Sequence, residues 1–359
     1  MTIEWLAGNR IRGTTAERPE FGLPSGSVGG WKELGRTTFG GGAKTYQVTC
    51  LADKRYLMVL VNNFQSAQIE GDSLRFNNDT TANQHAGRYN NDGGTDGTIT
   101  NKTKTNMFGF HPHSQPSFAV INVANFSTKE KLAIIHAIGH SSNTCGAGSA
   151  PNRSEMVAKY VNTSDPISSI QQVNNWANFD SGSEMVILGY DPTDTHTTNF
   201  WEELATHTQS SSGEATISFT SKKYLMIQYE ITALNPTATG LSIRFNSDTG
   251  NNYTRRFSQD GGSDSTNTSQ DKLSMIHSGG SHFFANMFII NNASNEKLII
   301  AHQVAKTSAS GGASEVPRRW EIAGKWSNTS DQISSLTFID TEQGSSGISK
   351  GTIKVWGSD

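Results

Sequence analysis

The chain lacks the many cysteines of a disulfide scaffold and the long apolar runs of a membrane-spanning helix. Of its 359 residues only two are cysteines, Cys50 and Cys145, so a framework of several disulfides is excluded. One bridge between them stays open, but two free, buried thiols are the interpretation we prefer. No apolar run approaches the roughly 18 residues that a spanning helix needs, which predicts that no segment crosses a membrane.

Charge is also scarce and nearly balanced. Charged residues make up 17% of the chain, the net charge is −3 and the pI is near 6.4. Such a balance gives no global attraction to nucleic acid or anionic lipid, so we expect neither as a partner. The first residues show no basic region followed by a long apolar stretch. We therefore expect no signal peptide, and synthesis in a cytoplasm.

Hydrophobic residues are few but large. They make up only 34% of the sequence, yet 17 Phe, 7 Trp and 8 Tyr can build a core from a small number of side chains. Together with 35 glycines, this composition indicates many short strands joined by tight turns. Helical candidates are scarce: residues 201–206 are the best candidate for a single turn, and no longer window shows a helical period.

The sequence repeats itself once over most of its length. Six segments of the first half recur in the same order in the second half, at an offset that stays between 166 and 170 residues. The matched pairs are 31–34 with 201–204, 54–58 with 222–226, 74–80 with 243–249, 92–96 with 260–264, 130–132 with 296–298, and 162–165 with 328–331. Because this period is longer than that of solenoid repeats, each copy is predicted to fold around its own core.

The repeat divides the chain into three regions. The first copy is predicted to cover residues 29–192 and the second copy residues 193–359, because the segments that close them, 185–190 and 353–358, match. Residues 1–28 have no equivalent before the second copy and contain two prolines. We interpret them as an N-terminal arm that docks on a neighbouring subunit.

Alternating apolar and polar residues predict β-strands in both copies. Leu225, Ile227 and Tyr229 share one face of a predicted strand, while Gln228 and Glu230 lie on the other. Further strands are predicted at residues 118–123, 132–138, 287–290, 298–304 and 320–326. Eight or more strands in each copy predict an all-β protein of two tandem antiparallel β-sandwiches of the jelly-roll kind. An immunoglobulin-like sandwich is the alternative, although its usual size is only about 100 residues.

No known catalytic signature is recognisable in the chain. A nucleophile elbow, a Walker loop and paired metal-binding cysteines are all missing, so we expect no enzyme activity and no catalytic residues. His136 and His302 form the one pair of histidines at matching positions, and we interpret them as side chains packed on a strand face. His111 and His113 are interpreted as loop residues and not as metal ligands.

One loop of the second copy has a spacing found in calcium sites. Asn246, Asp248 and Asn252 place side-chain oxygens at alternating positions, as loops that bind hard cations do. The alternative is that these residues, like Asp92 and Asp260 beside the Gly-Gly turns, stabilise turns through side chain to backbone hydrogen bonds. We prefer the turn interpretation, so no cofactor is expected and Ca²⁺ is kept as the alternative.

Basic and aromatic residues lie together in two places of the second copy. Arg255 and Arg256 follow a tyrosine, and Arg318 and Arg319 precede Trp320. Nucleic-acid binding would need a basic field that the chain lacks. Arginine next to an aromatic residue is also enriched at protein interfaces, so we predict contacts with other protein subunits at these residues.

Two segments carry a resemblance to known proteins. Residues 4–14 (EWLAGNRIRGT) with 31–36 (WKELGR), and residues 243–253 (IRFNSDTGNNY), are similar to segments of tandem-repeat virion structural proteins encoded by marine phages and environmental viruses. The first copy departs from the second pattern, since residues 80–84 read TTANQ. The resemblance implies a capsid-associated, decoration, fibre or tail component without catalytic residues. Within the arm, Arg10 and Arg12 are predicted contact residues.

The favoured hypothesis is therefore a structural protein located in the virion. Its expected partners are other copies of itself and other virion proteins, because rigid sandwiches assemble well through repeated weak contacts. One alternative is a module that binds a receptor or a glycan on the host surface. A polysaccharide-active enzyme is the other, and it would need a pair of carboxylates in a groove.

Overall fold

The fold consists of β-strands and the turns between them. A computed structural model describes residues 30–64, 72–106, 116–140, 145–174, 177–192, 194, 199–234, 240–277, 282–306, 313, 316–340 and 347–359. Every regular element in these ranges is a strand, which confirms the predicted all-β class. No helix within the same ranges has the length and apolar character to cross a membrane. The predicted arm with Arg10 and Arg12, and also His111 and His113, lie outside the described residues.

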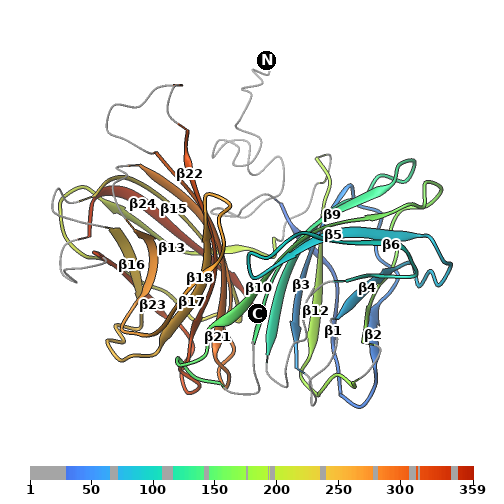
Figure 1. The fold of residues 1–359 in the computed structure, drawn as a ribbon, viewed down its shortest axis with the longest axis horizontal. Helices are drawn as coiled ribbons and strands as arrows, with labels where there is room; N and C mark the ends of the chain where they lie inside the picture. Colours follow the sequence, from blue (N-terminus) through green and yellow to red (C-terminus); the bar gives the residue numbers. More distant parts are fainter. Residues whose placement is uncertain are drawn as a thin grey trace.

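In the described residues of the first half of the chain, twelve strands form two antiparallel sheets (Figure 1). They are β1 (Lys32–Thr38), β2 (Thr45–Val48), β3 (Tyr56–Asn63), β4 (Ser73–Phe76), β5 (His85–Asn91), β6 (Gly97–Lys102), β7 (Thr105–Asn106), β8 (Ser117–Ala124), β9 (Lys131–His140), β10 (Pro151–Tyr160), β11 (Ile170–Val173) and β12 (Glu184–Tyr190). The large sheet has the order β1-β12-β3-β8-β9-β10-β5-β6, and the small sheet has the order β2-β11-β4-β7.

The second half repeats this arrangement strand for strand. Its strands are β13 (Glu202–Gln209), β14 (Ala215–Ser218), β15 (Tyr224–Leu234), β16 (Gly240–Phe245), β17 (Tyr253–Gln259), β18 (Ser265–Gln270), β19 (Leu273–His277), β20 (Phe283–Ile290), β21 (Lys297–Ala305), β22 (Arg318–Trp326), β23 (Ser335–Asp340) and β24 (Ile348–Ser358). The large sheet has the order β13-β24-β15-β20-β21-β22-β17-β18, and the small sheet has the order β14-β23-β16-β19. Within the described residues, no sheet mixes strands of the two halves.

Each half closes its own core between a large and a small sheet, as the jelly-roll prediction requires. Leu57, Val59 and Val61 point inward from β3 and pack against Leu74 and Phe76 of the small sheet. The first four strands alternate between the sheets, since β1 and β3 belong to the large sheet while β2 and β4 belong to the small one. A separate cluster fills the second sandwich. The two cores are therefore distinct.

The hydrogen-bond registers of the two large sheets match residue for residue. Phe118 pairs with Ile138 in the first sandwich, and Phe284 pairs with Val304 in the second. Positions on β8, β9 and β10 thus correspond to positions 166 residues later, as the repeat in the sequence requires. Strands β3, β5 and β12 correspond to positions 168 residues later.

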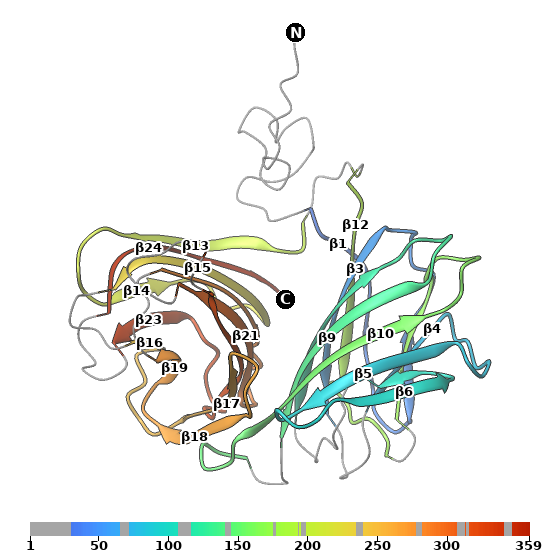
Figure 2. The ribbon, with the colours of Figure 1, turned by 45° about the horizontal axis from the view of Figure 1, so that its top comes forward.

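The two sandwiches pack against each other through the outer faces of their large sheets. A third apolar cluster lies between them and takes Leu60, Phe118 and Val186 from the first sandwich and Tyr224 and Leu298 from the second. The sheets meet where β10 approaches β17 and β22 and where β9 approaches β21, and they diverge from there (Figures 1 and 2). We call this contact the junction.

Two expectations about local structure were wrong. Residues 202–209 form strand β13 and not a helical turn, because Glu202 to Gln209 pair along the length of β24. Cys50 and Cys145 form no disulfide with each other, as preferred, but both are exposed and not buried.

Candidate functional site

The centre of the junction brings equivalent residues of the two copies together. His136 of β9 and His302 of β21 occupy the same position in the repeat, and their ring centroids lie 4.0 Å apart. Glu155 of β10 and Glu321 of β22 are also equivalent, and the guanidinium of Arg153 contacts both carboxylates. The two sandwiches are thus related by an approximate twofold axis that passes close to these residues.

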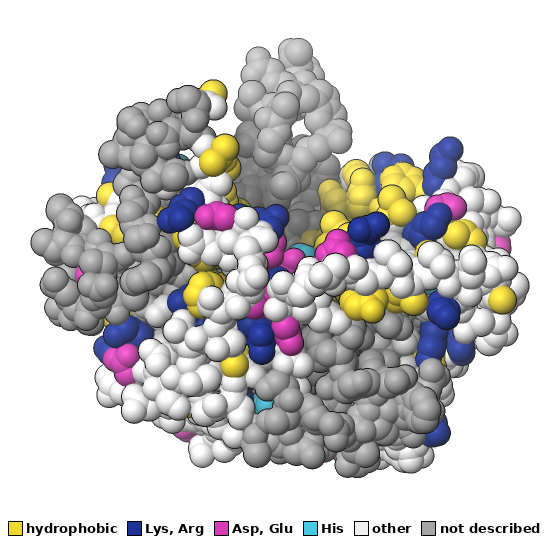
Figure 3. Space-filling model, viewed as in Figure 1, with side chains coloured by type: hydrophobic (Ala, Val, Ile, Leu, Met, Phe, Trp, Pro, Cys, Tyr) yellow, Lys and Arg dark blue, Asp and Glu magenta, His cyan; other side chains and the backbone are white. Residues whose placement is uncertain are grey.

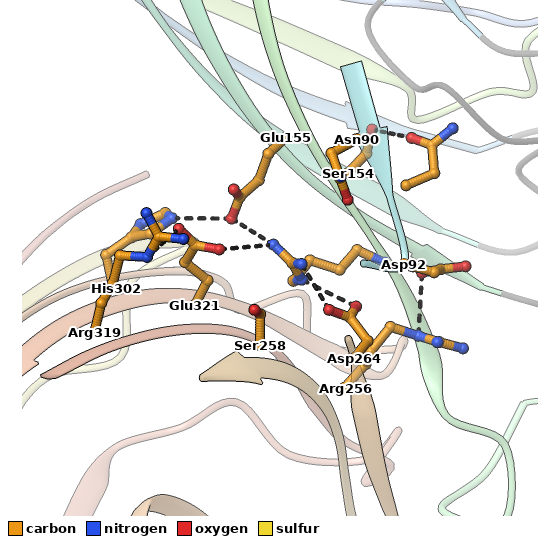
Figure 4. Close-up of polar contacts among 12 residues, drawn as sticks. Asn90, Asp92, Ser154, Glu155, Arg256, Ser258, Asp264, His302, Arg319 and Glu321 are labelled. Atoms are coloured by element: carbon orange, nitrogen blue, oxygen red, sulfur yellow. Dashed lines mark hydrogen bonds and ion pairs between the residues drawn. The ribbon is translucent and has the colours of Figure 1, made fainter. Parts of the chain in front are cut away.

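Arg153 of β10 organises the charged part of the junction. Its Nε and Nη2 donate to the two carboxylate oxygens of Asp264 at 3.1 and 2.7 Å, in the bidentate geometry that arginine favours. Its Nη1 lies 2.6 Å from Glu155 and 3.2 Å from Glu321. Figure 4 shows that Glu155, Glu321 and Asp264 converge on this point from both sandwiches, and that His302 approaches Glu155. One cation therefore holds three carboxylates together.

The ionisation of this cluster follows from its burial and its charges. Burial opposes the charge on Arg153, but the hydrogen bond to Asp264 and the surrounding carboxylates raise its pKa above the ordinary value. Burial alone would also raise the pKa of Glu155, yet the contact with His302 and the charge of Arg153 lower it to about 2. Burial and the neighbouring Glu155 raise the pKa of Glu321. Burial, followed by the nearby His302, lowers the pKa of His136 to about 3.

The turn after β5 places a glycine directly against the second sandwich. Gly93 has a φ of +70°, and a Cβ there would lie 2.5 Å from the backbone nitrogen of Asp264. Close by, Arg256 lies 3.1 Å from Asp92 and donates its Nε–H to the carbonyl of Pro151 at 2.8 Å. This turn therefore fits the junction only because residue 93 has no side chain.

One side of the twofold centre is tightly closed, and we call it the closed flank. Phe118 and Ile138 of the first sandwich pack there with Leu298 and Ile300 of the second. At its edge the carboxylate of Glu184 accepts hydrogen bonds from Tyr224 at 2.7 Å and from Lys223 at 2.9 Å. The closed flank combines an apolar interior with charged pairs at its rim.

The opposite side is formed by the equivalent positions of the two copies but is uncovered, and we call it the open flank. Phe118 is 1% exposed, whereas its equivalent Phe284 is 46% exposed. Ile300 is 5% exposed, whereas its equivalent Ile134 is 51% exposed. Apart from Val316, every exposed large hydrophobic side chain of the described residues lies on this flank. They are Tyr56, Phe126, Leu132, Ile134 and Val157 of the first sandwich and Phe284 and Val304 of the second.

A pair of charges shows the same contrast between the flanks. Lys325 and Glu296 lie 3.1 Å apart on the closed flank, with side chains 0% and 2% exposed. Their equivalents Lys159 and Glu130 lie 3.0 Å apart, with side chains 44% and 43% exposed. The two pairs have the same local geometry and differ only in how far they are buried. Hydrophobic side chains gather over β9 and its neighbours in the space-filling view, where the open flank lies (Figure 3).

The second sandwich has partly exchanged apolar for polar residues on the open flank. Gln228 and Asn286 stand where the closed flank has Leu60 and Val120. The amide of Gln228 donates to that of Asn286 at 2.8 Å. The apolar character of the open flank is therefore concentrated on the first sandwich.

One group in the junction has the ligand types of a transition-metal site. His140, Cys145 and Glu296 place one ligand atom each within 4.8 Å of one another. The carboxylate of Glu296 already lies 3.1 Å from the ammonium of Lys325 and 3.4 Å from the imidazole of His140. A cation at this carboxylate would be repelled by that ammonium. We therefore assign the group to the ionic contact between the sandwiches.

The predicted calcium loop is held together by its own hydrogen bonds. The side-chain oxygen of Asn246 accepts from the backbone of Ser334 at 2.9 Å. Asp248 accepts from the backbone of Gly250 at 2.8 Å and from the indole of Trp326 at 2.7 Å, and Asn252 donates to it at 2.9 Å. These are the bonds that the turn interpretation predicts, and Ca²⁺ binding stays the alternative.

The predicted subunit contacts fall in different environments. Trp320 lies in the core of the second sandwich, and burial of Arg255 lowers its pKa to about 10, so neither side chain is placed to touch a partner. Arg256 contacts the first sandwich, and Arg318 contacts Asp260 at 3.3 Å. Arg319, the equivalent of Arg153, lies 3.2 Å from Glu321, and its side chain is 59% exposed on the open flank.

The cavity in the junction is too small for catalysis on a substrate. It has a volume of about 10 Å³ and is lined by His136, Arg153, Glu155 and His302 among others. Such a volume admits one water molecule at most. The histidines and carboxylates that line it belong to the contact between the two sandwiches.

The fold and this junction define a class: an all-β protein of two jelly-roll-like sandwiches joined face to face. No family model matches the chain, and no curated protein sequence matches it. Among solved structures it is similar to the LG1-3 region of the laminin alpha2 chain, with 8% identity, a TM-score of 0.20, and coverage of 88% of this chain and 64% of that one. It is also similar to domains LG4-5 of the mouse laminin alpha1 chain, with 11% identity, a TM-score of 0.19, and coverage of 92% and 89%. The chain thus spans less than two thirds of the alpha2 region, and at these TM-scores neither likeness bears on function.

Proposed function

We propose that this chain is a non-catalytic structural protein of a virus particle that acts by self-association and by docking on neighbouring subunits. The observation that carries the proposal is the gathering of seven exposed large hydrophobic side chains on the open flank. Contiguous exposed apolar surface is rare on monomeric proteins and marks sites of protein contact. The resemblance of residues 4–14 and 243–253 to virion proteins supports the viral setting.

The closed flank supports a structural role for a second reason. An apolar cluster and the Arg153 ion cluster join the two sandwiches over a continuous surface. A large, partly apolar interface between domains opposes relative motion. The chain is thus suited to act as one rigid block, which repeated assembly requires.

Sedimentation of the purified full chain tests self-association. We expect the weight-average mass to rise above 38.9 kDa as the protein concentration increases. A mass that stays at the monomer value up to millimolar concentration would contradict the proposal. Mass spectrometry of purified particles of the virus that carries the gene tests the setting, and we expect this chain among the structural proteins.

A glycan- or receptor-binding module is the second candidate. It is favoured by a hollow of about 720 Å³ in the first sandwich, lined by polar groups that include Asn78, Asp79, Tyr160 and Asp165. Carboxylates and amides of this kind can accept and donate hydrogen bonds to sugar hydroxyls. Saturable binding on a glycan array that is lost in the Asp79→Ala chain would support this candidate.

A further inference from the structure

We infer that the open flank of the first sandwich is the docking site for the N-terminal segment, residues 1–29, of a neighbouring copy of this chain. The inference rests on the proposed function, since it assumes that copies associate. It names the two surfaces that meet. The donor is the segment before β1, and the acceptor is the apolar band formed by Tyr56, Phe126, Leu132, Ile134 and Val157.

The acceptor band is equivalent to a surface of the second sandwich that the first sandwich covers. Leu298 and Ile300 in the second sandwich are covered by Phe118 and Ile138 of the first. Their equivalents, Leu132 and Ile134, are more than half exposed. The same outer face of the same fold is thus buried in one copy and uncovered in the other. This asymmetry indicates that the uncovered band receives an apolar partner.

The N-terminal segment directly precedes the sandwich whose apolar band is uncovered. The second sandwich follows the first after a short connection between Tyr190 and Glu202, and its band is covered by the first sandwich. The first sandwich, whose band is uncovered, is preceded by 29 further residues. Ile3, Trp5 and Leu6 give this segment apolar side chains at its far end.

The point where the segment joins the fold lies at one end of the acceptor band. Gly30 is buried, and the ring of Trp31 lies 5.9 Å from that of Tyr190. The row continues to Tyr56, 6.3 Å from Tyr190, and to Phe126, 6.3 Å from Tyr56. Four strand spacings of about 4.8 Å separate β1 from β9, so roughly six extended residues can cross the band. A segment of 29 residues reaches about 95 Å when extended, which is enough to leave its own sandwich and cross the band of a neighbour.

Each copy would then carry one donor and one acceptor. A contact between two different surfaces is heterologous, and it builds either a closed ring or an open filament. Blocking the donor in one copy and the acceptor in another should therefore leave a pair that can form a single contact. This property gives the inference a test that uses only full-length chains.

The test uses a donor variant, Trp5→Glu with Leu6→Glu, and an acceptor variant, Ile134→Glu with Val157→Glu. Ile134 and Val157 are about half exposed, so the folded state should tolerate both charges, and thermal unfolding checks this. Ser218→Glu on the outward face of β14 is the matched control and should assemble as the unaltered chain does. Each variant alone should sediment as a monomer of 38.9 kDa, and their equimolar mixture should form a species of twice that mass and nothing larger.

The outcomes separate the inference from the proposed function. If the unaltered chain assembles and the two variants also assemble alone, the open flank is not the contact and only the inference fails. If both variants are monomers but the mixture stays monomeric, the segment does not dock on a neighbour and the inference again fails alone. If the unaltered chain is itself a monomer, because its own segment covers the band or because nothing does, both proposals fail.

Discussion

His136 and His302 occupy the same position in two copies of one fold and touch each other across the junction, with ring centroids 4.0 Å apart. The contact places the twofold centre of the duplicated protein at a pair of equivalent side chains. On one side of it the two large sheets are in close contact, and on the other side they diverge (Figure 2). Equivalent residues on the two sides of this centre, such as Arg153 and Arg319, therefore serve as matched controls for each other.

We predict that acid weakens the fold through His136. Burial holds its pKa at about 3 in the folded protein, against about 6.5 in an unfolded chain. Below pH 6.5 the unfolded state therefore binds a proton that the folded state does not. The free energy of unfolding should fall as the pH drops from 6.5 toward 3, by up to about 1.4 kcal/mol per pH unit for this group. Urea unfolding at several pH values measures the slope, and the His136→Asn chain should show a shallower one. Equal slopes would count against a buried neutral imidazole.

We predict that Arg153→Met destabilises the protein far more than Arg319→Met. Removal of Arg153 leaves Asp264, Glu155 and Glu321 close together without their shared cation, which costs about 3–5 kcal/mol for a buried pair. Arg319 is exposed, so its loss should cost less than about 1 kcal/mol. Urea unfolding of both chains at neutral pH compares them. Similar losses would mean that the Arg153 cluster is not held in the junction as described.

We predict a similar contrast for the two lysine–glutamate pairs. Lys325→Met should cost about 3–5 kcal/mol because it leaves Glu296 buried without its ammonium partner. Lys159→Met removes the equivalent exposed pair and should cost less than about 1 kcal/mol. Thermal and urea unfolding measure both effects. Raising the salt concentration should weaken the Lys159 pair more, since exposed charges are screened and buried ones are not.

We predict that Gly93→Ala disturbs the junction and that Gly261→Ala does not. Both glycines have a positive φ, so both variants pay about 1 kcal/mol in backbone strain. Only the new Cβ at position 93 would lie 2.5 Å from the backbone of Asp264 in the other sandwich, whereas at 261 the nearest atom is the flexible end of Arg319 at 3.0 Å. Gly93→Ala should therefore be the less stable chain, and limited proteolysis between the sandwiches should be faster. Equal stability of the two variants would argue against the close contact.

The sequence predicted the architecture of each copy but not the way the copies meet. The alternation of apolar and polar residues over 224–231 and the long repeat were enough to predict two tandem sandwiches. A strand with one apolar face is stable only where that face is buried. The outer face of the first copy nevertheless carries a sequence pattern that indicates a covered sheet. Residues 57–61 read LMVLV and residues 185–188 read MVIL, and such uninterrupted apolar runs are typical of strands covered on both faces.

The residues of the site were harder to predict for a physical reason. Arg153 stands alone among polar residues in the sequence, and its partners Asp264 and Glu321 lie more than a hundred residues away. Only the packing of two complete sandwiches brings them together. Arg318, Arg319 and Trp320 looked similar as a cluster, yet strand alternation sends Trp320 into the core and Arg319 to the surface.

The exchange of Leu60 and Val120 for Gln228 and Asn286 favours contact on one flank of the twofold centre over contact on the other. Two identical domains related by a twofold axis could make the same contact on either side of that axis. If the open flank closed instead, the hydrogen-bonded amides of Gln228 and Asn286 would be buried in an apolar contact. Leu60 and Val120, which are now buried, would be exposed to water. The duplication has thus made one flank the favoured contact, so that every copy of the protein presents the same uncovered face.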